Sequence, residues 1–566
     1  MAVGDDADSA SDDDADDATR LMPRAKHQHR RSEPAPTITK VAQAEPATDD
    51  DAPAARSHGI LLALILLSAV VTRFYGIAEY SLWLDEIWTI ETATARGSPH
   101  LLLPEGVIIT EPPVLTSLDG APPWWRIWTS MREMTHPPLY LIVLRWWMEA
   151  FGTGPMAVRS LSAVSSVIAV LLLYDVVRLQ LSSRGAAAWA AVLLIVAGPQ
   201  VQFAQEVRPY AFMVMLALAA ADALVRVERL GATPLRLAAF AAALLALMLT
   251  HYFALGTAAA MGAYFVLRTR GTQRRRLLVA VACAAMIFAI AWGPFMWGHR
   301  STFSDVNTRF LHDPAGRAGG GHVLRTLGWL IAVPARLFSD YVGEIIPAIG
   351  VTTVVIALAV YASRKRQDLL MWCLWLGGTV GLVALLDLTR GTRHLHFMRY
   401  TLLAGPALYA IAAALAWHAG AYARHVLPAT IALVCAAMLP GAGMAMWKAN
   451  WRDLAREFEQ SLRPGDVLVV AGSDPTYSRG AYLCISHFAT KPRPPFALVT
   501  GRADDALVAQ LRAAPGVVLF TQEQAIPNPQ FVTLGECDAT IITGRAGAGG
   551  VMRITWAEEK AGKGSQ

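Results

Sequence analysis

Residues 59–91 read GILLALILLSAVVTRFYGIAEYSLWLDEIWTIE, an apolar run followed by two adjacent carboxylates among tryptophans. The apolar run approaches the roughly 20 residues that an α-helix needs to cross a bilayer. Asp85 and Glu86 then follow between Trp83 and Trp88, near the expected membrane surface, where carboxylates are costly unless they are paired, hydrated or functional. The stretch indicates either the reactive edge of a membrane enzyme or an interfacial helix with Trp anchors and two solvated acids.

The composition of the whole chain supports a membrane protein. The 566 residues are 54% hydrophobic and only 16% charged, whereas soluble domains average about 25% charged residues. Repeated apolar runs near bilayer length explain the difference, so the predicted fold class is a polytopic α-helical membrane protein. Nucleic-acid binding is not indicated, because the basic residues are spread over short loops and form no single patch.

The N-terminal segment, residues 1–57, has a different character. DDADSASDDDADD (5–17) is followed by a basic stretch that contains Arg20, Arg24, Lys26, Arg30 and Arg31. The segment has too few apolar residues to fold, so we expect a disordered tail. No small-residue cleavage site follows the first apolar run, which is therefore read as a retained span and not as a signal peptide.

The positions of Arg and Lys predict how the chain crosses the membrane. The alternate connections RLQLSSRG, RVERLGATPLR, RTRGTQRRR, SRKRQ and HAGAYARH hold most of the short-loop basic residues. The positive-inside rule places these connections and the N-terminal tail in the cytoplasm. The stretch 136–152 is then a short helix at the interface. About 11 spans result, near 59–75, 156–177, 186–203, 210–225, 236–250, 254–268, 277–297, 347–363, 369–387, 400–417 and 426–446.

The transmembrane domain predicted in this way covers 58–446 and gathers most chemically capable residues on its outer side. The outer segments are the first loop 76–155, 204–212, 250–253, 298–346 and 387–400. The long loop 298–346 is either a lid or acceptor-binding segment, or an idle connector.

The C-terminal region, 447–566, is predicted to be a small extracytoplasmic α/β domain. Its first helix is expected to start near Asn450 and Asp453 and to stop before Pro464. VLVVA, AYLCIS, FALVTG, GVVLFTQ, ATIITG and VMRITW are predicted strands, and RADDALVAQLRAA is a predicted helix. Outside the cytoplasm Cys484 and Cys537 could form a disulfide.

Five motifs stand in order along the chain: WLDEIWT (83–89), HPPLY (136–140), QEVRPYAF (205–212), THYF (250–253) and RYTLLAGPAL (399–408). Together they resemble the GT-C superfamily of membrane glycosyltransferases. This superfamily includes dolichyl- or polyprenyl-phosphate-mannose protein mannosyltransferases and the similar lipid A aminoarabinose transferases. The resemblance covers roughly 59–446 and extends to the first helix of the C-terminal domain.

The resemblance implies a function. The donor would be a monosaccharide linked to polyprenyl phosphate, and the acceptor a lipid, protein or glycan at the outer face of the inner (plasma) membrane. Transfer of the hexosyl or pentosyl group would invert the anomeric carbon, with no cofactor and no metal. A transporter or flippase of polyprenyl-linked glycans is the alternative, which predicts charged residues within spans and paired broken helices.

Roles for individual residues follow from the resemblance. Asp85 matches the acidic residue of the family's first loop and is the candidate base that takes the acceptor proton, with Glu86 in support. The leaving phosphate needs cationic partners, for which Arg208 and Arg399 are the candidates. Each is followed by a tyrosine, Tyr210 or Tyr400, that we assign to the same substrate site.

Three further residues are weaker candidates for donor binding. His136 opens HPPLY and either binds phosphate or acceptor, or orients the following helix. His251 is either a ligand-binding or a structural interfacial histidine. Glu206 either belongs to the site or neutralises Arg208. The nearby His394 and His396 could bind a metal, but a stable site needs more ligands than the sequence places there.

Overall fold

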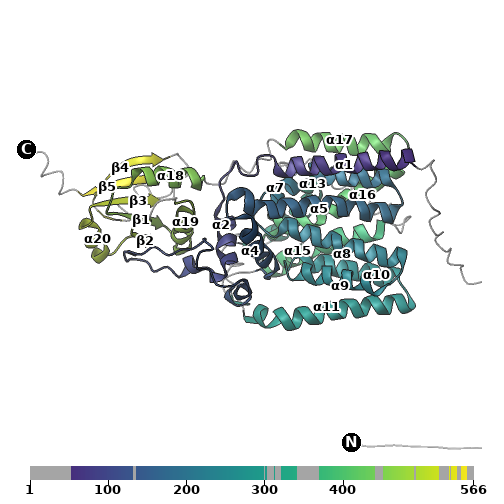
Figure 1. Ribbon diagram of the computed structural model, residues 1–566, viewed down its shortest axis with the longest axis horizontal. Helices are drawn as coiled ribbons and strands as arrows, with labels where there is room; N and C mark the ends of the chain where they lie inside the picture. The colour runs from purple at the N-terminus through teal and green to yellow at the C-terminus, as the bar shows by residue number, and fades with distance from the viewer. Residues whose placement is uncertain are drawn as a thin grey trace, which may run out of the picture. The chain divides into compact units, whose positions relative to one another are not determined.

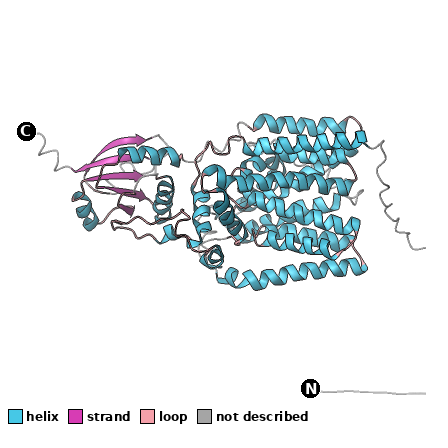
Figure 2. Ribbon diagram, in the orientation of Figure 1, coloured by secondary structure: helices cyan, strands magenta, loops and turns pink. Residues whose placement is uncertain are grey.

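A computed structural model describes eleven stretches of the chain, with the gaps between them left undescribed. The chain divides into residues 1–57, of which 52–57 are described, and residues 58–566. The second unit contains both a helical bundle and a five-stranded sheet (Figure 2). The described residues are 52–131, 136–298, 300–301, 311–312, 320–340, 369–439, 450–489, 493–521, 534–535, 537–544 and 550–556.

Apolar helices form the bundle, and α5, α8 and α11 run roughly parallel to one another (Figure 1). Within the described residues, five helices are long and apolar enough to cross a membrane: α1 (Ala52–Phe74), α5 (Pro155–Leu181), α8 (Tyr210–Leu230), α11 (Gly271–Gly298) and α15 (Leu370–Arg390). A bent pair, α6 (Arg184–Val196) and α7 (Gly198–Ala204), makes up to six. Shorter apolar helices are α9 (Pro234–Met248), α10 (Ala254–Arg268), α16 (Gly405–His418) and α17 (Ala423–Met438).

These helices coincide with the predicted spans, except that 347–363 and the last part of 426–446, residues 440–446, lie outside the described residues. The predicted membrane fold class is therefore confirmed, while the number of spans stays a prediction. Helix α4 (Leu139–Phe151) has only 13 residues, as expected for the interfacial segment. Helix α13 (Gly320–Phe338) occupies part of the long loop 298–346.

The bend between α6 and α7 has a local cause. Pro199 lacks an N–H, so it cannot donate to the carbonyl of Ile195 one turn earlier. The guanidinium of Arg73, fully buried at the end of α1, supplies the missing donors. Its Nη1 donates to Ile195 O at 2.5 Å and its Nη2 to Leu194 O at 2.7 Å. A buried cation thus satisfies the carbonyls at the broken turn.

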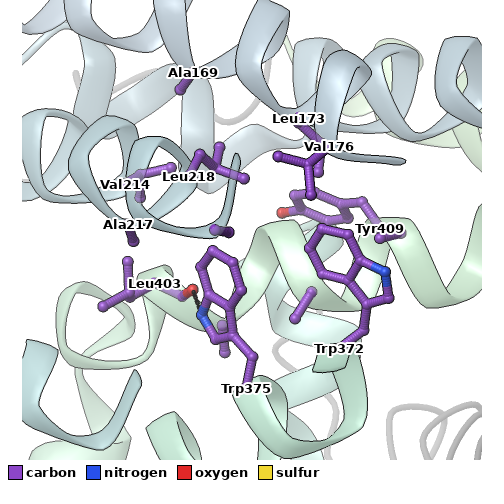
Figure 3. Close-up of a cluster of buried hydrophobic side chains, with 14 of the residues drawn as sticks. Ala169, Leu173, Val176, Val214, Ala217, Leu218, Trp372, Trp375, Leu403 and Tyr409 are labelled. Atoms are coloured by element: carbon purple, nitrogen blue, oxygen red, sulfur yellow. Dashed lines mark hydrogen bonds between the residues drawn. The ribbon is translucent and has the colours of Figure 1, made fainter. Parts of the chain in front are cut away.

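A cluster of aromatic side chains fixes the segment that carries Arg399. Trp372 and Trp375 of α15 stack with ring centroids 5.8 Å apart, packed against α5, α8 and Tyr409 of α16 (Figure 3). Trp375 Nε1 donates to the carbonyl of Leu403 at 2.9 Å. The chain just after Arg399 is therefore tied to the centre of the bundle.

Helices α10 and α15 approach closely because glycines face each other. A Cβ on Gly378 would lie 2.7 Å from Gly256 O and 2.9 Å from Ala260 Cβ. Next to this contact, the hydroxyls of Thr257 and Thr379 are hydrogen-bonded at 2.7 Å. Small residues and a polar pair of this kind are typical of helix packing inside membranes.

Gly378→Ala is expected to destabilise the bundle by about 1–3 kcal/mol, because the added methyl group must push two backbones apart. Thermal unfolding of the purified protein in detergent measures the effect. Gly377→Ala is the matched control, since a Cβ there meets no atom within 4 Å. Equal unfolding temperatures for the two variants would contradict the close-packing argument.

The C-terminal part contains a mixed sheet in the order β2-β1-β3-β5-β4 (Figure 1). β2, β1 and β3 are parallel to one another, and β5 is antiparallel to both of its neighbours, β3 and β4. The elements are α18 (Trp451–Ser461), β1 (Asp466–Gly472), α19 (Pro475–Phe488), β2 (Phe496–Thr500), α20 (Asp505–Arg512), β3 (Gly516–Thr521), β4 (Cys537–Gly544) and β5 (Gly550–Trp556). Asn450 caps α18 by accepting from Asp453 N, as the sequence predicts.

One predicted strand is wrong. AYLCIS lies inside helix α19, whose first turn is set by the Asp474 cap and by Pro475. A short apolar run fits a buried strand and a buried helix equally, and here the cap decides. The disulfide between Cys484 and Cys537 is also not formed. Cys484 packs between α19 and one face of the sheet, whereas Cys537 belongs to the cluster on the other face.

The first loop and the C-terminal domain share one hydrophobic core. Ile87 and Ile90 of α2 (Leu84–Glu91) belong to the same buried cluster as Tyr482 of α19 and Leu468 of β1. Ile109 exchanges backbone hydrogen bonds with Phe496 of β2, at 2.7 and 3.0 Å. The helix that carries Asp85 is thus packed directly against the C-terminal domain.

Candidate active site

Four connections of the bundle meet around α2. The backbone N–H of Leu139, in HPPLY, donates to Leu249 O just before THYF at 3.0 Å. Arg208 Nη1 donates to Thr89 Oγ1 of α2 at 3.0 Å. Arg399 reaches the same helix through its contact with Asp85. The structure therefore brings together all five motifs that carry the resemblance.

Asp85 and Glu86 have opposite environments. Successive helical residues point about 100° apart, so the two side chains leave α2 in different directions. The Asp85 side chain is 25% exposed, whereas that of Glu86 is fully buried. Only Asp85 is accessible to a substrate.

Glu86 is held by a buried guanidinium. Arg159 of α5 binds both carboxylate oxygens, with Nε to Oε1 at 2.8 Å and Nη2 to Oε2 at 2.7 Å. Glu86 also accepts from the backbone N–H of Val207 at 3.0 Å and of Trp83 at 3.2 Å. This geometry makes Glu86 a positioning residue that fixes α2 against α5.

Arg159 is the main residue that the sequence interpretation missed. Its guanidinium also donates to the carbonyls of Ile77, Tyr80 and Ser81, so it holds the chain that leads into α2. The available signal was a single cation inside the apolar run 156–177, since charges in such runs mark functional positions.

Arg159→Met is expected to destabilise the protein by about 3–5 kcal/mol, because it leaves the Glu86 carboxylate buried without its partner. Thermal unfolding in detergent measures the loss. Adding Glu86→Gln to the same variant removes the unpaired charge and should recover part of the lost stability. The control Arg178→Met breaks a partly exposed pair with Asp175 and should cost at most about 1 kcal/mol. Similar losses for both single variants would refute the buried-pair assignment.

The Asp85 carboxylate lies between the two predicted arginines. Its Oδ2 is 3.7 Å from Arg208 Nη2 and 3.6 Å from Arg399 Nη1. These distances exceed a direct hydrogen bond, so both guanidiniums retain donors for another anion. The Nε atoms of Arg208 and Arg399 are buried and have no hydrogen-bond partner among the described residues.

His136 and His251 are adjacent at the same site, with ring centroids 4.7 Å apart. His251 Nδ1 accepts from the backbone N–H of Phe253 at 3.2 Å, so the neutral ring carries its proton on Nε2. That Nε2–H is buried and has no partner in the described part of the chain. His251 therefore offers a neutral donor to a bound group.

Both imidazoles are held in the neutral form. Burial, with the nearby Arg208 and Arg399, lowers the pKa of His251 to about 3. Burial, His251 and the same guanidiniums lower the pKa of His136 well below its usual value. Neither ring is expected to carry a charge at neutral pH.

The depressed pKa of His251 predicts a pH-dependent stability. Below the unfolded-state pKa of about 6.5 the unfolded chain binds a proton that the folded protein does not, so stability falls as the pH falls towards 3. Between pH 7 and pH 5 the wild-type protein loses free energy of unfolding, and His251→Gln should make this loss smaller by about 2 kcal/mol. Thermal unfolding at the two pH values measures it, with the exposed His425→Gln as control. An unchanged pH dependence in His251→Gln would contradict the neutral assignment.

The remaining predicted site residues surround this centre. Tyr210 is buried, with Arg208 over its ring at 5.8 Å, and Arg399 lies 5.2 Å from the ring centroid of Tyr400. Burial, partly offset by Arg399, raises the pKa of Tyr400, so it stays a neutral phenol. Glu206 is buried just before Arg208 in the connection from α7 to α8.

The loop before Arg399 is organised by a second buried carboxylate. Asp387, at the end of α15, accepts from His394 Nδ1 and Thr392 Oγ1, both at 2.8 Å. Arg336 of α13 donates to the carbonyls of Leu395 and His396. The ring of His394 in turn packs edge-on against Tyr400, with centroids 5.0 Å apart.

His394 and His396 therefore have separate partners, since the ring of His396 faces Trp329 at 4.8 Å. Within the described residues, no group of three or more His, Cys, Asp or Glu side chains could hold a metal ion.

Comparison with known proteins yields one family and several solved structures. Residues 135–297 match the family described as Dolichyl-phosphate-mannose-protein mannosyltransferase. The crystal structure of ArnT from Cupriavidus metallidurans bound to undecaprenyl phosphate has a TM-score of 0.53 and 14% identity, covering 87% of this chain and 97% of that one. The chain has the GT-C fold. The apo structure of the same ArnT has a TM-score of 0.52 and 14% identity, covering 88% of this chain and 98% of that one.

The similarity to GT-C proteins is distant in sequence, and no curated protein matches the chain. The family match contains Arg159, Arg208 and His251 but ends before Arg399 and begins after Asp85. The resemblance drawn from the five motifs is nevertheless confirmed.

Proposed function

We propose that the protein is a membrane glycosyltransferase that moves a hexosyl or pentosyl group from a polyprenyl-phosphate donor to a lipid, protein or glycan acceptor. Transfer takes place at the outer face of the inner membrane, with the N-terminal tail in the cytoplasm. The observation that carries the proposal is the accessible Asp85 carboxylate between the guanidiniums of Arg208 and Arg399.

The arrangement suits a single displacement. Asp85 takes the proton from the acceptor hydroxyl while that oxygen forms a bond to the anomeric carbon. The bond from this carbon to the phosphate oxygen breaks, and the polyprenyl phosphate leaves with the electron pair. Attack opposite the leaving group inverts the anomeric carbon, and no covalent enzyme intermediate is needed.

The cations suit the leaving group. Polyprenyl phosphate gains negative charge as it departs, and preorganised guanidiniums stabilise that charge in a partly dry site. The Nε–H groups of Arg208 and Arg399 and the Nε2–H of His251, which have no partner among the described residues, supply hydrogen bonds without a change in protonation. The family match and the ArnT complex with undecaprenyl phosphate support a donor of this class.

The transporter alternative has less support. It predicts paired broken helices around a central site, whereas the described residues contain one bent pair. The carbonyls at that bend accept hydrogen bonds from Arg73 and are not left to coordinate an ion.

Asp85→Asn is expected to reduce sugar transfer by at least about a hundredfold while the protein still folds, because the amide cannot accept the acceptor proton. The assay follows radiolabelled sugar from a polyprenyl-phosphate donor into membrane glycoconjugates, with folding checked by thermal unfolding. Wild-type transfer by a folded Asp85→Asn protein would refute the catalytic assignment.

Arg208→Lys and Arg399→Lys provide the companion test of the leaving-group site. Both should slow transfer, since a lysine cannot reproduce a bidentate contact with phosphate. Arg393→Lys, an exposed arginine in the same loop as Arg399, is the matched control. Equal activity in all three variants would refute the assignment of Arg208 and Arg399 as phosphate ligands.

A further inference from the structure

A groove lies where the ends of α1, α4 and α5 meet helix α18 of the C-terminal domain. It has a volume of about 1060 Å³, at the upper end of the range of ligand pockets. One wall is apolar and comes from the ends of bundle helices, including Phe151 of α4 and Met156 of α5. These two side chains are strongly exposed, at 62% and 57%.

The opposite wall is charged and comes from one helix of the C-terminal domain. Arg452, Arg456 and Glu459 of α18 line the groove. Their spacing of four and three residues puts them on one helical face. The other face of α18, with Trp451, Ala455 and Phe458, is buried. The groove therefore joins a membrane-helix surface to a helix face that carries Arg452, Arg456 and Glu459, where Arg456 also contacts Asp453 Oδ1 at 3.4 Å.

The groove is separate from the candidate active site. On α5, Arg159 points to Glu86 of α2, whereas Ser160 and Val164 line the groove. Neither Asp85 nor Arg208 nor Arg399 is among the residues that line the groove. An occupant of the groove would not be in line with the sugar-transfer centre.

We propose that this groove binds a phospholipid whose headgroup carries a phosphate and a primary ammonium group, the chemistry of phosphatidylethanolamine. The phosphate is held by Arg452 and Arg456, because guanidinium groups bind phosphate oxygens in a bidentate way. The ammonium group faces Glu459, and an acyl chain lies along Phe151, Met156 and Val164. This headgroup matches the charges of α18 better than one with a phosphate alone.

The proposed lipid would also support α2. Arg452 donates through Nη2 to the carbonyls of Ala78 and Tyr80, at 3.1 and 3.2 Å. Its backbone N–H donates to Ser81 Oγ at 3.1 Å. These residues form the segment that leads into α2 and that Arg159 holds from the other side. A headgroup on Arg452 would fix the position of α18 against this segment.

Native mass spectrometry of the purified full-length protein tests the proposal. The protein is exchanged into an equal mixture of phosphatidylethanolamine, phosphatidylglycerol and phosphatidylcholine with identical acyl chains. Wild type should retain phosphatidylethanolamine about tenfold over phosphatidylcholine, whose quaternary ammonium cannot donate to Glu459. Arg456→Gln should weaken retention of all three lipids, and Glu459→Gln should abolish the preference for phosphatidylethanolamine over phosphatidylglycerol.

Glu457→Gln is the matched control, because Glu457 lies on the same helix, is exposed and does not line the groove. Its lipid retention should equal that of wild type. Thermal unfolding with and without added lipid gives a second measurement, in which phosphatidylethanolamine raises the midpoint of wild type but not of Arg456→Gln. Equal retention of the three lipids by wild type, or unchanged selectivity in Glu459→Gln, would overturn the proposal. Neither outcome depends on the sugar-transfer activity.

Discussion

The buried contact between Arg159 and Glu86 determines where the reactive groups lie. Removing a guanidinium and a carboxylate from water is expensive, and the cost is offset only when nearly all their donors and acceptors are used. Here Arg159 holds three carbonyls before α2, and Glu86 accepts the N–H of Val207. Asp85 precedes Glu86 by one residue, and Arg208 follows Val207 by one. A single ion pair therefore sets the spacing between the candidate base and one candidate phosphate ligand.

The C-terminal domain contributes to the same site by packing. Helix α19 covers the side of α2 that faces away from the bundle, and Gly480 makes this approach possible, since a Cβ there would lie 3.1 Å from Leu84. The carbonyl of Leu103 accepts from Arg479 of α19 at 3.0 Å. The domain thus forms part of the wall that positions α2. A division of the chain near residue 447 separates sequence segments that share one core.

The sequence predicted the bundle well because long apolar runs and basic loops are strong local signals. It also placed Asp85, Arg208 and Arg399 on the same outer side of the membrane, while their separate roles came from the family resemblance and stay predictions. It could not distinguish a partly exposed Asp85 from a buried Glu86, because that difference depends on Arg159, which is 73 residues away from Glu86. The role of Asp387 was missed for the same reason, as its contacts form only when the loop at 391–397 folds back. AYLCIS was misread because its apolar pattern alone does not exclude a helix.

The contacts between the first loop and the C-terminal domain also join parts of the chain that are made far apart in time. Ser81 and Arg452 are 371 residues apart in sequence, yet their hydrogen bond lies at the entrance to α2. Contacts of such separation form late, because the intervening chain must be made and ordered first. A nascent chain that has already inserted its bundle would still lack one side of α2. The side of α2 that α19 covers is therefore completed only after the C-terminal residues have been made and folded.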